Sequence, residues 1–453
     1  MDARSPLEKL LRPFSDVRAG EGPRVIGMLA SLLLLMIAYY LLKTVREPLV
    51  LASGGAELKS YAAGLQAVLL IAFVPAYAWL TRRVGRRGLI IGLVGFFFVN
   101  LQLFYVTLRL GSRFVGVAFF VWVGIFSLSV IAQFWSLAND LYSQDQGERL
   151  FPIVAFGATL GSPVGARIAE VLFKRGVAPQ NMMQLAAVLL LAHGAITLLL
   201  AGPRKAAPAA TTNVDRPLRG GPGAFRLVAR SPYLRLVALL LVLLNIVNTV
   251  GEYVLSKNVV NAAAAAVASG QAASKAEFIG GFYGDFFFWV NVAAALLQAL
   301  LVSRLVKHLG VGGVLLFLPV LAVGVYGTLA AGASFALVRW LKTAENAADY
   351  SVMNTGRAMM WLPTTRLEKY RAKQAIDTFF VRFGDVLATA LVAGARFLQL
   401  APSTLAAVNA LLGAVWIAVA WRVVTHHQSL SHPVVAAPPT ERARVPLPRL
   451  RAV

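Results

Sequence analysis

The sequence predicts an all-α membrane protein with about 12 transmembrane helices, arranged as two groups of six. Of its 453 residues, 58% are hydrophobic and only 14% are charged, whereas soluble domains contain about 45–50% apolar and about 25% charged residues. The apolar residues gather in stretches of about 20, the length of a helix that crosses a bilayer. A soluble enzyme is therefore excluded. A membrane β-barrel is excluded as well, because its strands alternate apolar and polar residues over about 10 positions.

A polar segment, residues 1–24, precedes the first apolar stretch and lacks the apolar core of a signal peptide. The first helix is expected at 25–42, and apolar sequence resumes at Pro48–Ala52 beyond a charged patch, which indicates that this helix continues. The other helices of the first bundle (residues 25–201) are expected at 60–80, 88–108, 114–139, 150–173 and 181–201. Those of the second bundle (residues 233–424) are expected at 234–256, 278–303, 311–331, 334–360, 374–398 and 402–424.

Two polar segments flank the second bundle. Residues 202–232 are rich in Pro, Gly, Ala and Arg, a composition typical of a flexible linker. Residues 425–453 become basic and proline-punctuated, which predicts a disordered tail. Two groups of six helices joined by such a linker are the layout of the major facilitator architecture. The basic turn at 81–87, Thr-Arg-Arg-Val-Gly-Arg-Arg, resembles the glycine-and-arginine signature of those transporters.

The net charge of +23, from 43 Lys and Arg against 20 Asp and Glu, indicates orientation. Basic residues crowd the first 24 positions, the 81–87 turn, the linker and the tail, whereas the opposite loops hold scattered cations such as Lys59 and Lys174. Basic loops stay in the cytoplasm, so both termini of this multi-pass inner-membrane protein are expected there. The charge also attracts anionic membrane lipids, and nucleic acid is not expected as a partner.

Ionisable side chains within apolar helices are expensive in lipid, so they are candidates for function. Lys43 and Arg46 lie three positions apart on one helical face, and Glu47 follows. We predict that Lys43 and Arg46 bind substrate, because the planar guanidinium of Arg binds phosphate in a bidentate way, and that Glu47 serves charge pairing. The alternative is that the cations reach lipid headgroups at the end of the helix.

Two acids stand in the second bundle. Glu252, accompanied by Asn245, Asn248 and Lys257 along one helix, is a predicted substrate-site residue, with a static interhelical hydrogen bond as the alternative. Asp285 lies among aromatic residues and close glycines, so it must meet a donor. Lys373 or Arg382 is expected to be that donor, in either a structural salt bridge or a gate.

A further set of charges begins the fifth helix of each bundle. Lys373 is predicted to bind substrate, and the alternative is an ordinary cytoplasmic loop. The other members are predicted to pair charges or to form gates: Asn139, Asp140, Glu148, Arg149, Asp377 and Arg382.

No enzymatic site is recognised. The chain has no cysteine, which excludes thiol catalysis and thiolate metal sites. Its five histidines lack metal-ligand spacing, and it has no phosphate-binding loop of the Walker type. No catalytic residue, cofactor or metal is expected.

Several separated segments carry a family resemblance: 42–51, 55–57, 134–139, 148–158, 252, 283–286, 348–351, 361–363 and 372–377. In these segments the chain resembles the ATP/ADP (nucleotide) translocase family of plastids and intracellular bacteria. The resemblance implies a facilitator-like fold. It places the family's lysine of helix 1 at Arg46 and the substrate-binding lysine of helix 11 at Lys373, whereas the family's acid in helix 4 has no counterpart between Phe114 and Leu137.

The leading hypothesis is a secondary transporter that moves a small phosphate-bearing anion, a nucleotide, by alternating access to a central charged cavity. One alternative is a transporter of an anionic lipid or another amphiphile on the same fold. Another, from a different class, is a membrane scaffold or sensor that does not transport.

Overall fold

The computed structural model describes residues 5–11, 15–81, 83–111, 114–201 and 222–431. These residues are helical and contain no strand, which confirms the predicted all-α class. Nine described segments are long and apolar enough to cross a membrane, and two of them, Gly22–Thr81 and Lys275–Ala330, are double passes. With both arms of these segments and the more polar pass from Phe335 to Met359, the described chain makes twelve passes.

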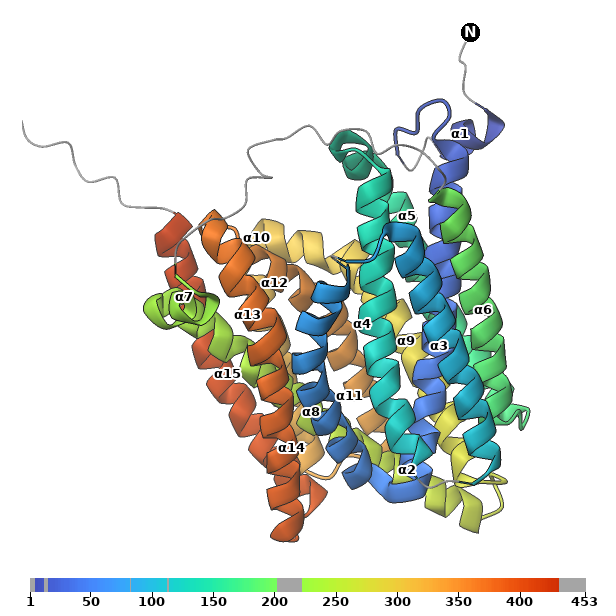
Figure 1. The fold of residues 1–453 in the computed structure, drawn as a ribbon. Coiled ribbons are helices and arrows are strands. Elements are labelled where there is room, and N and C mark those ends of the chain that lie inside the picture. Colours follow the sequence, from blue (N-terminus) through green and yellow to red (C-terminus); the bar gives the residue numbers. More distant parts are fainter. Residues whose placement is uncertain (1–4, 12–14, 82, 112–113, 202–221, 432–453) are drawn as a thin grey trace, which may run out of the picture.

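The first bundle, coloured blue to green in Figure 1, follows a short helix α1 (Pro6–Leu11). It contains α2 (Gly22–Thr81), α3 (Arg86–Arg109), α4 (Val115–Leu141), α5 (Gln144–Lys174) and α6 (Pro179–Leu200). The two passes of α2 meet at Gly55, whose φ of 71° and ψ of −168° break the helix. Glycine adopts this backbone conformation without a steric penalty. The first pass therefore continues beyond Pro48, as predicted.

The second bundle begins with α7 (Ala224–Arg230) and α8 (Pro232–Ala268). It continues with α9 (Lys275–Leu297), η2 (Gln298–Val302), α10 (Ser303–Ala330), α11 (Phe335–Ala348), η3 (Asp349–Met353) and α12 (Asn354–Met359). It ends with η4 (Glu368–Ala372), α13 (Lys373–Ala375), η5 (Ile376–Phe380), α14 (Val381–Phe397) and α15 (Pro402–Ser431). The η elements are π-helical turns, which are wider than α turns and occur often at functional sites.

Two predicted boundaries differ from the structure. Helix α7 lies inside the segment 202–232 that was predicted to be a flexible linker. Residues 425–431 continue α15, although disorder was predicted from 425, because His427 is buried beside Tyr233 and its Nε2 lies 3.3 Å from the Met359 carbonyl oxygen. The remainder of both predictions, at 202–221 and 432–453, lies outside the described residues.

A glycine stripe holds the first bundle together. Gly157, Gly161 and Gly165 of α5 face α2. A Cβ at each would lie 2.5, 2.7 and 2.7 Å from the carbonyl oxygens of Leu29, Leu33 and Ile37, respectively. Small residues at this spacing let two membrane helices approach closely, so the stripe fixes α5 against α2.

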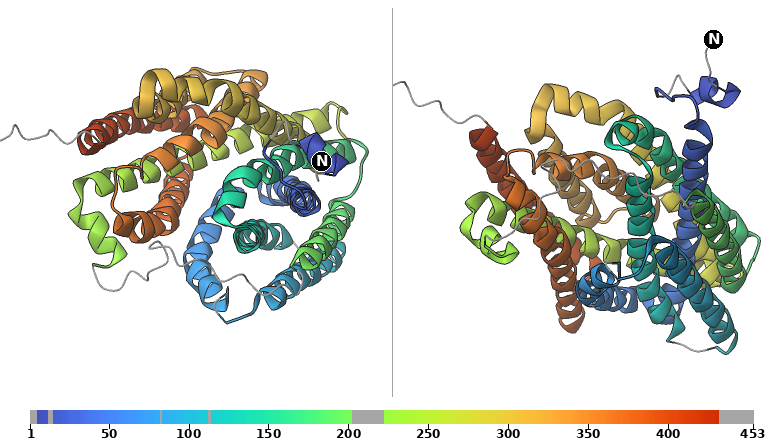
Figure 2. Two further views of the ribbon diagram at one scale, coloured as in Figure 1. Left: turned by 90° about the horizontal axis from the view of Figure 1, so that it is seen from above. Right: turned by 45° about the horizontal axis from the view of Figure 1, so that its top comes forward.

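The two bundles stand side by side, as Figure 2 shows from above. We call the end that carries α1 the amino-terminal face and the end at which α5 finishes the opposite face (Figure 1). The bundles touch tightly near the opposite face, where a Cβ on Gly284 of α9 would lie 2.7 Å from the backbone of Glu170 in α5. This contact positions the charged residues described next.

Candidate functional site

A chain of alternating charges crosses from the first bundle to the second. In α2, Arg46 Nε donates to Glu47 Oε1 at 3.0 Å, and Lys59 Nζ lies 2.8 Å from Glu47 Oε2. Lys59 Nζ also lies 3.6 Å from Oε2 of Glu252, in α8 of the second bundle. Glu47 is only 1% exposed. Buried charges are tolerated when they are paired and hydrogen-bonded, so these four residues stabilise one another as a unit, which we call the central cluster.

Polar side chains of the second bundle complete the central cluster. Lys59 Nζ donates to Ser256 Oγ at 3.0 Å and to the Tyr283 hydroxyl at 3.3 Å. Asn346 Nδ2 in α11 donates to Glu252 Oε1 at 3.1 Å. One lysine of the first bundle therefore bonds to three side chains of the second.

Arg46 of the central cluster and Lys43, three positions before it in α2, form what we call the cationic wall. Lys43 Nζ lies 4.2 Å from the centre of the Phe287 ring and donates to the Tyr350 hydroxyl at 3.2 Å. The Arg46 guanidinium lies 4.4 Å from the centre of the Phe120 ring. Cations over aromatic faces are stabilised electrostatically.

Some side chains in and around this wall are partly exposed. Tyr350 is 41% exposed, and its hydroxyl touches Lys43 of the other bundle. The Glu252 side chain is 28% exposed and that of Arg46 is 16% exposed. Arg46, Glu252 and the Tyr350 ring are therefore the accessible part of this site, whereas Lys43, Phe120 and Phe287 are buried beside them. A guanidinium next to an exposed aromatic ring is suited to an anion that carries a planar group.

The structure brings together four of the predicted residues, Lys43, Arg46, Glu47 and Glu252, and does not bring Lys373 to them. Lys373 Nζ lies 5.9 Å from the Trp361 ring, within the second bundle. Between described residues it makes no ion pair with the central cluster. Asp377 lies within range of electrostatic attraction by Lys373 and Arg357. Arg382 pairs with Asp385 at 3.2 Å, and Thr249 donates to Asp385 at 2.9 Å.

Asp285 belongs to a second interbundle network, near the opposite face. It pairs with Arg339 of α11 and, at 3.6 Å, with Arg167 of α5. The expectation that Lys373 or Arg382 is its donor is therefore wrong. Arg167 also pairs with Glu170, which lies 2.7 Å from Lys174 Nζ.

A third interbundle contact lies on the same side. Lys257 Nζ of α8 lies 2.5 Å from Glu57 Oε1 of α2, and the Tyr253 hydroxyl donates to the same carboxylate at 3.0 Å. Together with the Asp285 network, this contact joins the two bundles toward the opposite face.

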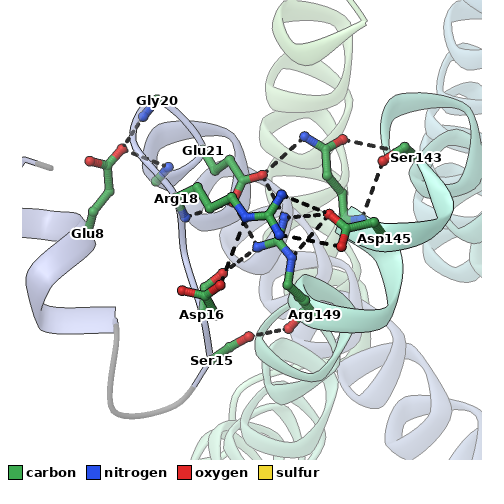
Figure 3. A network of polar contacts seen from close by, with 11 residues as sticks. Glu8, Ser15, Asp16, Arg18, Gly20, Glu21, Ser143, Asp145 and Arg149 are labelled. Carbon is green, nitrogen blue, oxygen red and sulfur yellow. Dashed lines mark hydrogen bonds and ion pairs between the residues drawn. The ribbon is translucent and has the colours of Figure 1, made fainter. Parts of the chain in front are cut away.

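The ion pairs of the amino-terminal face remain inside the first bundle. Arg149 lies 3.0 Å from Glu21 and 3.1 Å from Asp145, and it donates to the Asp16 carbonyl (Figure 3). Asp145 also pairs with Arg18 at 3.1 Å. Between described residues, no ion pair on this face joins the two bundles.

The other gating candidates lie on this face too. Asp140 is 3.9 Å from Arg86, and Glu148 accepts from Gln144 at 3.1 Å. Asn139 and Glu148 line a pocket of about 760 Å³ together with aromatic side chains such as Trp135 and Phe151. The gating roles of these residues stay predictions.

Hydrogen bonds hold two carboxylates of the amino-terminal segment in the charged form. The backbone N–H of Ser5 lowers the pKa of Glu8 most strongly, and those of Gly20 and Gly22 add to it. Burial raises the pKa of Glu21, but the bonds from Arg149 and the Arg18 N–H outweigh it, so this pKa lies below its ordinary value. Glu8 thereby links Ser5 to Gly20 and Gly22, and Glu21 links Arg18 to Arg149.

Several interior polar residues escaped the sequence analysis. Lys59 was expected in an outer loop, but it lies inside α2 and is buried. Lys342 and Glu345 of α11 are buried and paired at 2.5 Å. A usable pattern was present, because Lys342, Glu345 and Asp349 recur every three or four positions and so share one helical face. Among the described residues, no group of three or more His, Asp and Glu side chains is arranged to hold a metal ion.

Comparison with known proteins identifies the fold. A mutant of the nucleoside transporter NupG superposes with a TM-score of 0.66 at 11% identity, covering 88% of this chain and 99% of that one. The fold is that of a secondary membrane transporter. The POT family transporter PepTSo gives a TM-score of 0.64 at 11% identity, over 90% and 98% of the two chains. A bacterial homologue of the iron transporter ferroportin gives 0.62 at 14%, over 88% and 98%.

These matches confirm a multi-pass membrane protein with a major-facilitator-like fold, and the matched proteins are transporters rather than enzymes. No protein-family model and no curated protein matches the sequence. At this level of identity the likeness concerns the fold, and the cargo has to be argued from the site.

Proposed function

We propose that this transporter moves a small phosphate-bearing anion, a nucleotide of the ATP/ADP type, across the inner membrane by alternating access. The observation that carries the proposal is the wall made by Lys43 and Arg46 beside Tyr350, Phe120 and Phe287. The cations match phosphate, and the exposed Tyr350 ring matches a nucleobase. The resemblance to the nucleotide translocases at 42–51 points to the same cargo.

The central cluster explains how an anion would be coupled to movement of the bundles. Arg46 shares Glu47 with Lys59, and Lys59 also holds Glu252 of the second bundle. A phosphate that takes Arg46 leaves Glu47 to Lys59 alone, which weakens the hold of Lys59 on Glu252. Substrate binding thereby loosens a contact that keeps the two bundles together at this level.

The distribution of basic residues supports a cytoplasmic amino-terminal face. In that orientation the interbundle ion pairs stand on the outer side, at Asp285 and Glu57. The present state would then receive substrate from the cytoplasm. Both termini would be cytoplasmic, as predicted.

The test is uptake of labelled ATP, ADP and inorganic phosphate into proteoliposomes. Arg46→Ala is expected to lower nucleotide uptake by about 10-fold or more, because charge-assisted bonds to a ligand contribute about 1.5–3 kcal/mol. Arg109→Ala is the matched control, since Arg109 only covers the Tyr105 ring at the end of α3. Equal uptake by the wild type and by Arg46→Ala would show that Arg46 does not bind the substrate. If the wild type takes up none of the three solutes, a nucleotide is not the cargo.

The pocket at the amino-terminal face favours a second cargo, an anionic amphiphile. It holds about 760 Å³ and is lined largely by apolar and aromatic side chains, with no Lys or Arg among them. An acyl chain would occupy its apolar part. Thermal stabilisation of the purified protein by anionic lipid, without stabilisation by nucleotide, would favour this cargo. If the protein is a scaffold or sensor that does not transport, accessibility labelling would reach the space between the bundles from only one side of the membrane, whichever ligand is added.

A further inference from the structure

A second group of buried charges lies inside the second bundle, behind the central cluster. Lys342 of α11 is 0% exposed, and its Nζ lies 2.5 Å from Glu345 Oε2. The hydroxyl of Tyr326, in α10, donates to both oxygens of Glu345 at 2.7 and 2.9 Å, and Lys342 donates to that hydroxyl at 3.1 Å. These contacts form a closed triad that the substrate site does not touch directly.

The triad borders a small polar void. The void measures about 10 Å³ and is lined by Glu345, Asp349, Asn248 and Trp416 with the apolar residues Leu244, Val247 and Leu318, which is room for roughly one water molecule. Trp416 is 1% exposed, and its indole N–H has no hydrogen-bond partner within the part of the chain that the structure describes. A water molecule in the void could accept a hydrogen bond from the Trp416 N–H and donate to the carboxylates of Glu345 and Asp349, so it would satisfy these buried polar groups.

The backbone around the void is irregular on the same side. Asp349 begins the π-helical turn η3, directly after α11. Such turns interrupt the α-helical hydrogen-bond ladder and recur at functional sites. The void is therefore bordered by two carboxylates and by the irregular pass that also carries Tyr350 of the cationic wall.

The triad is coupled to the central cluster through neighbouring residues. Gly251 of α8 packs directly on it, since a Cβ there would overlap the Tyr326 hydroxyl and lie 2.8 Å from Lys342 Nζ. The next residue, Glu252, feels the charge of Lys342 and is bonded by Asn346, the neighbour of Glu345. Lys342 thus stands between two acids, Glu345 and Glu252.

We infer that Glu345 is a proton-binding site whose occupancy controls the interbundle contact between Lys59 and Glu252. A proton from water, delivered through the void, adds to a Glu345 oxygen. Lys342 keeps its own proton and shifts its ion pairing from Glu345 to Glu252. Glu252 is then drawn from Lys59, 3.6 Å away, and the bundles are free to separate at this level. The charge of the second bundle rises by one for each proton bound.

A proton suits the triad better than a metal ion does. Lys342 already provides a positive charge 2.5 Å from Glu345, and a second fixed cation in the void would be repelled by it. The ionisable groups that face Glu345 are Tyr326 from α10, Lys342 from its own helix, Asp349 from η3 and Glu252 from α8. From α15 the void receives only the neutral Trp416.

The inference rests on the proposed alternating access but not on the cargo, so its test uses no substrate. The chain has no cysteine, so spin labels attach only at cysteines that are introduced. The substitutions Arg87→Cys and Lys369→Cys place one label on each bundle, at exposed positions on the amino-terminal face. Distances are measured in nanodiscs across about pH 5 to 9, where buried carboxyl groups titrate. Infrared difference spectra over the same range follow the C=O band of protonated carboxyl groups.

For the wild type, acidification is expected to change the ratio of long to short label distances about fivefold or more, the usual size of a coupling between sites. Glu345→Gln is expected to remove both the pH dependence and one carboxyl band. Tyr326→Phe keeps the ring and removes one donor to the carboxylate, so it is expected to move the midpoint to higher pH. Glu8→Gln replaces an equally buried acid whose hydrogen bonds stay within the amino-terminal segment, and it is expected to leave the midpoint unchanged.

Three results would overturn the proton site. The first is a set of wild-type label distances that do not change with pH, and the second is a Glu345→Gln protein with the same pH dependence as the wild type. The third is loss of the carboxyl C=O band in Asp349→Asn and not in Glu345→Gln. A response of the distances when sodium salt replaces choline salt at constant pH would indicate that the void binds a metal ion, and it would refute proton binding at Glu345. If ATP but not pH moves the labels, this inference fails while the proposed function stands.

Discussion

The two faces of the molecule use ion pairs in opposite ways. At the opposite face, Asp285 and Glu57 pair with cations of the other bundle, whereas at the amino-terminal face Arg149 pairs only within its own. The bundles also pack closely at Gly284 but are not joined by described ion pairs near α1. The comparison shows which contacts must break for the molecule to change state, because pairs inside one bundle can move with it as a rigid body.

The largest effect is expected where the two bundles share one buried cation. Lys59→Ala leaves Glu47 and Glu252 without that cation, and removing one partner of a buried pair costs about 3–5 kcal/mol. We expect reduced thermal stability of the purified protein and easier opening of the opposite face. Both can be measured, by thermal unfolding and by thiol accessibility of a cysteine introduced at Ser256, which touches Lys59.

Lys275→Ala provides the control for this prediction, because Lys275 is an exposed residue at the start of α9. Equal stability of the Lys59→Ala and Lys275→Ala proteins would show that Glu47 and Glu252 find other partners. The central cluster would then not be the contact that holds the bundles.

A smaller effect is expected from the close packing at the opposite face. Gly284→Ala places a methyl group 2.7 Å from the backbone of Glu170, so α5 and α9 must separate. Overpacking of this kind costs about 1–3 kcal/mol, which should shift the equilibrium toward a state open at that face. Gly281→Ala, one turn earlier, meets only Lys174 Cγ at 3.7 Å and should behave as wild type. Distances between spin labels on the two bundles would measure the difference, and indistinguishable variants would contradict it.

The sequence predicted the fold better than the pairing of its charges. Apolar stretches of bilayer length locate most passes, and Lys43, Arg46, Glu47 and Glu252 were recognised as interior charges because each interrupts such a stretch. Lys59 was missed because it follows the Gly54–Gly55 pair, where a loop was expected, whereas the helix resumes at once after the kink.

The partners of Asp285 could not be predicted for a different reason. Arg167 and Arg339 come from helices of different bundles, and which helices meet depends on the state of the transporter. Sequence separation carries no information about such a pair. The triad is predictable only in part. Lys342 and Glu345 share a helical face, which the sequence shows. Tyr326 belongs to another helix, and its contact with Glu345 depends on how the two helices pack.

The smallest effect is expected at the amino-terminal face, from pH. The pKa of Glu21 lies below its ordinary value in the folded protein, so the contact with Arg149 stabilises the segment above about pH 4.3, the value of an unfolded Glu. It is lost as the pH falls through the folded value, because protonated Glu21 no longer attracts Arg149. A spin label at Lys9→Cys should therefore become more mobile in acid, while interbundle distances near this face stay unchanged by this contact. Glu21→Gln should give the mobile spectrum already at neutral pH. A label equally immobile in both proteins would mean that the backbone bonds to Glu8 hold the segment without Arg149, and the ion pairs of this face would then contribute little even to their own bundle.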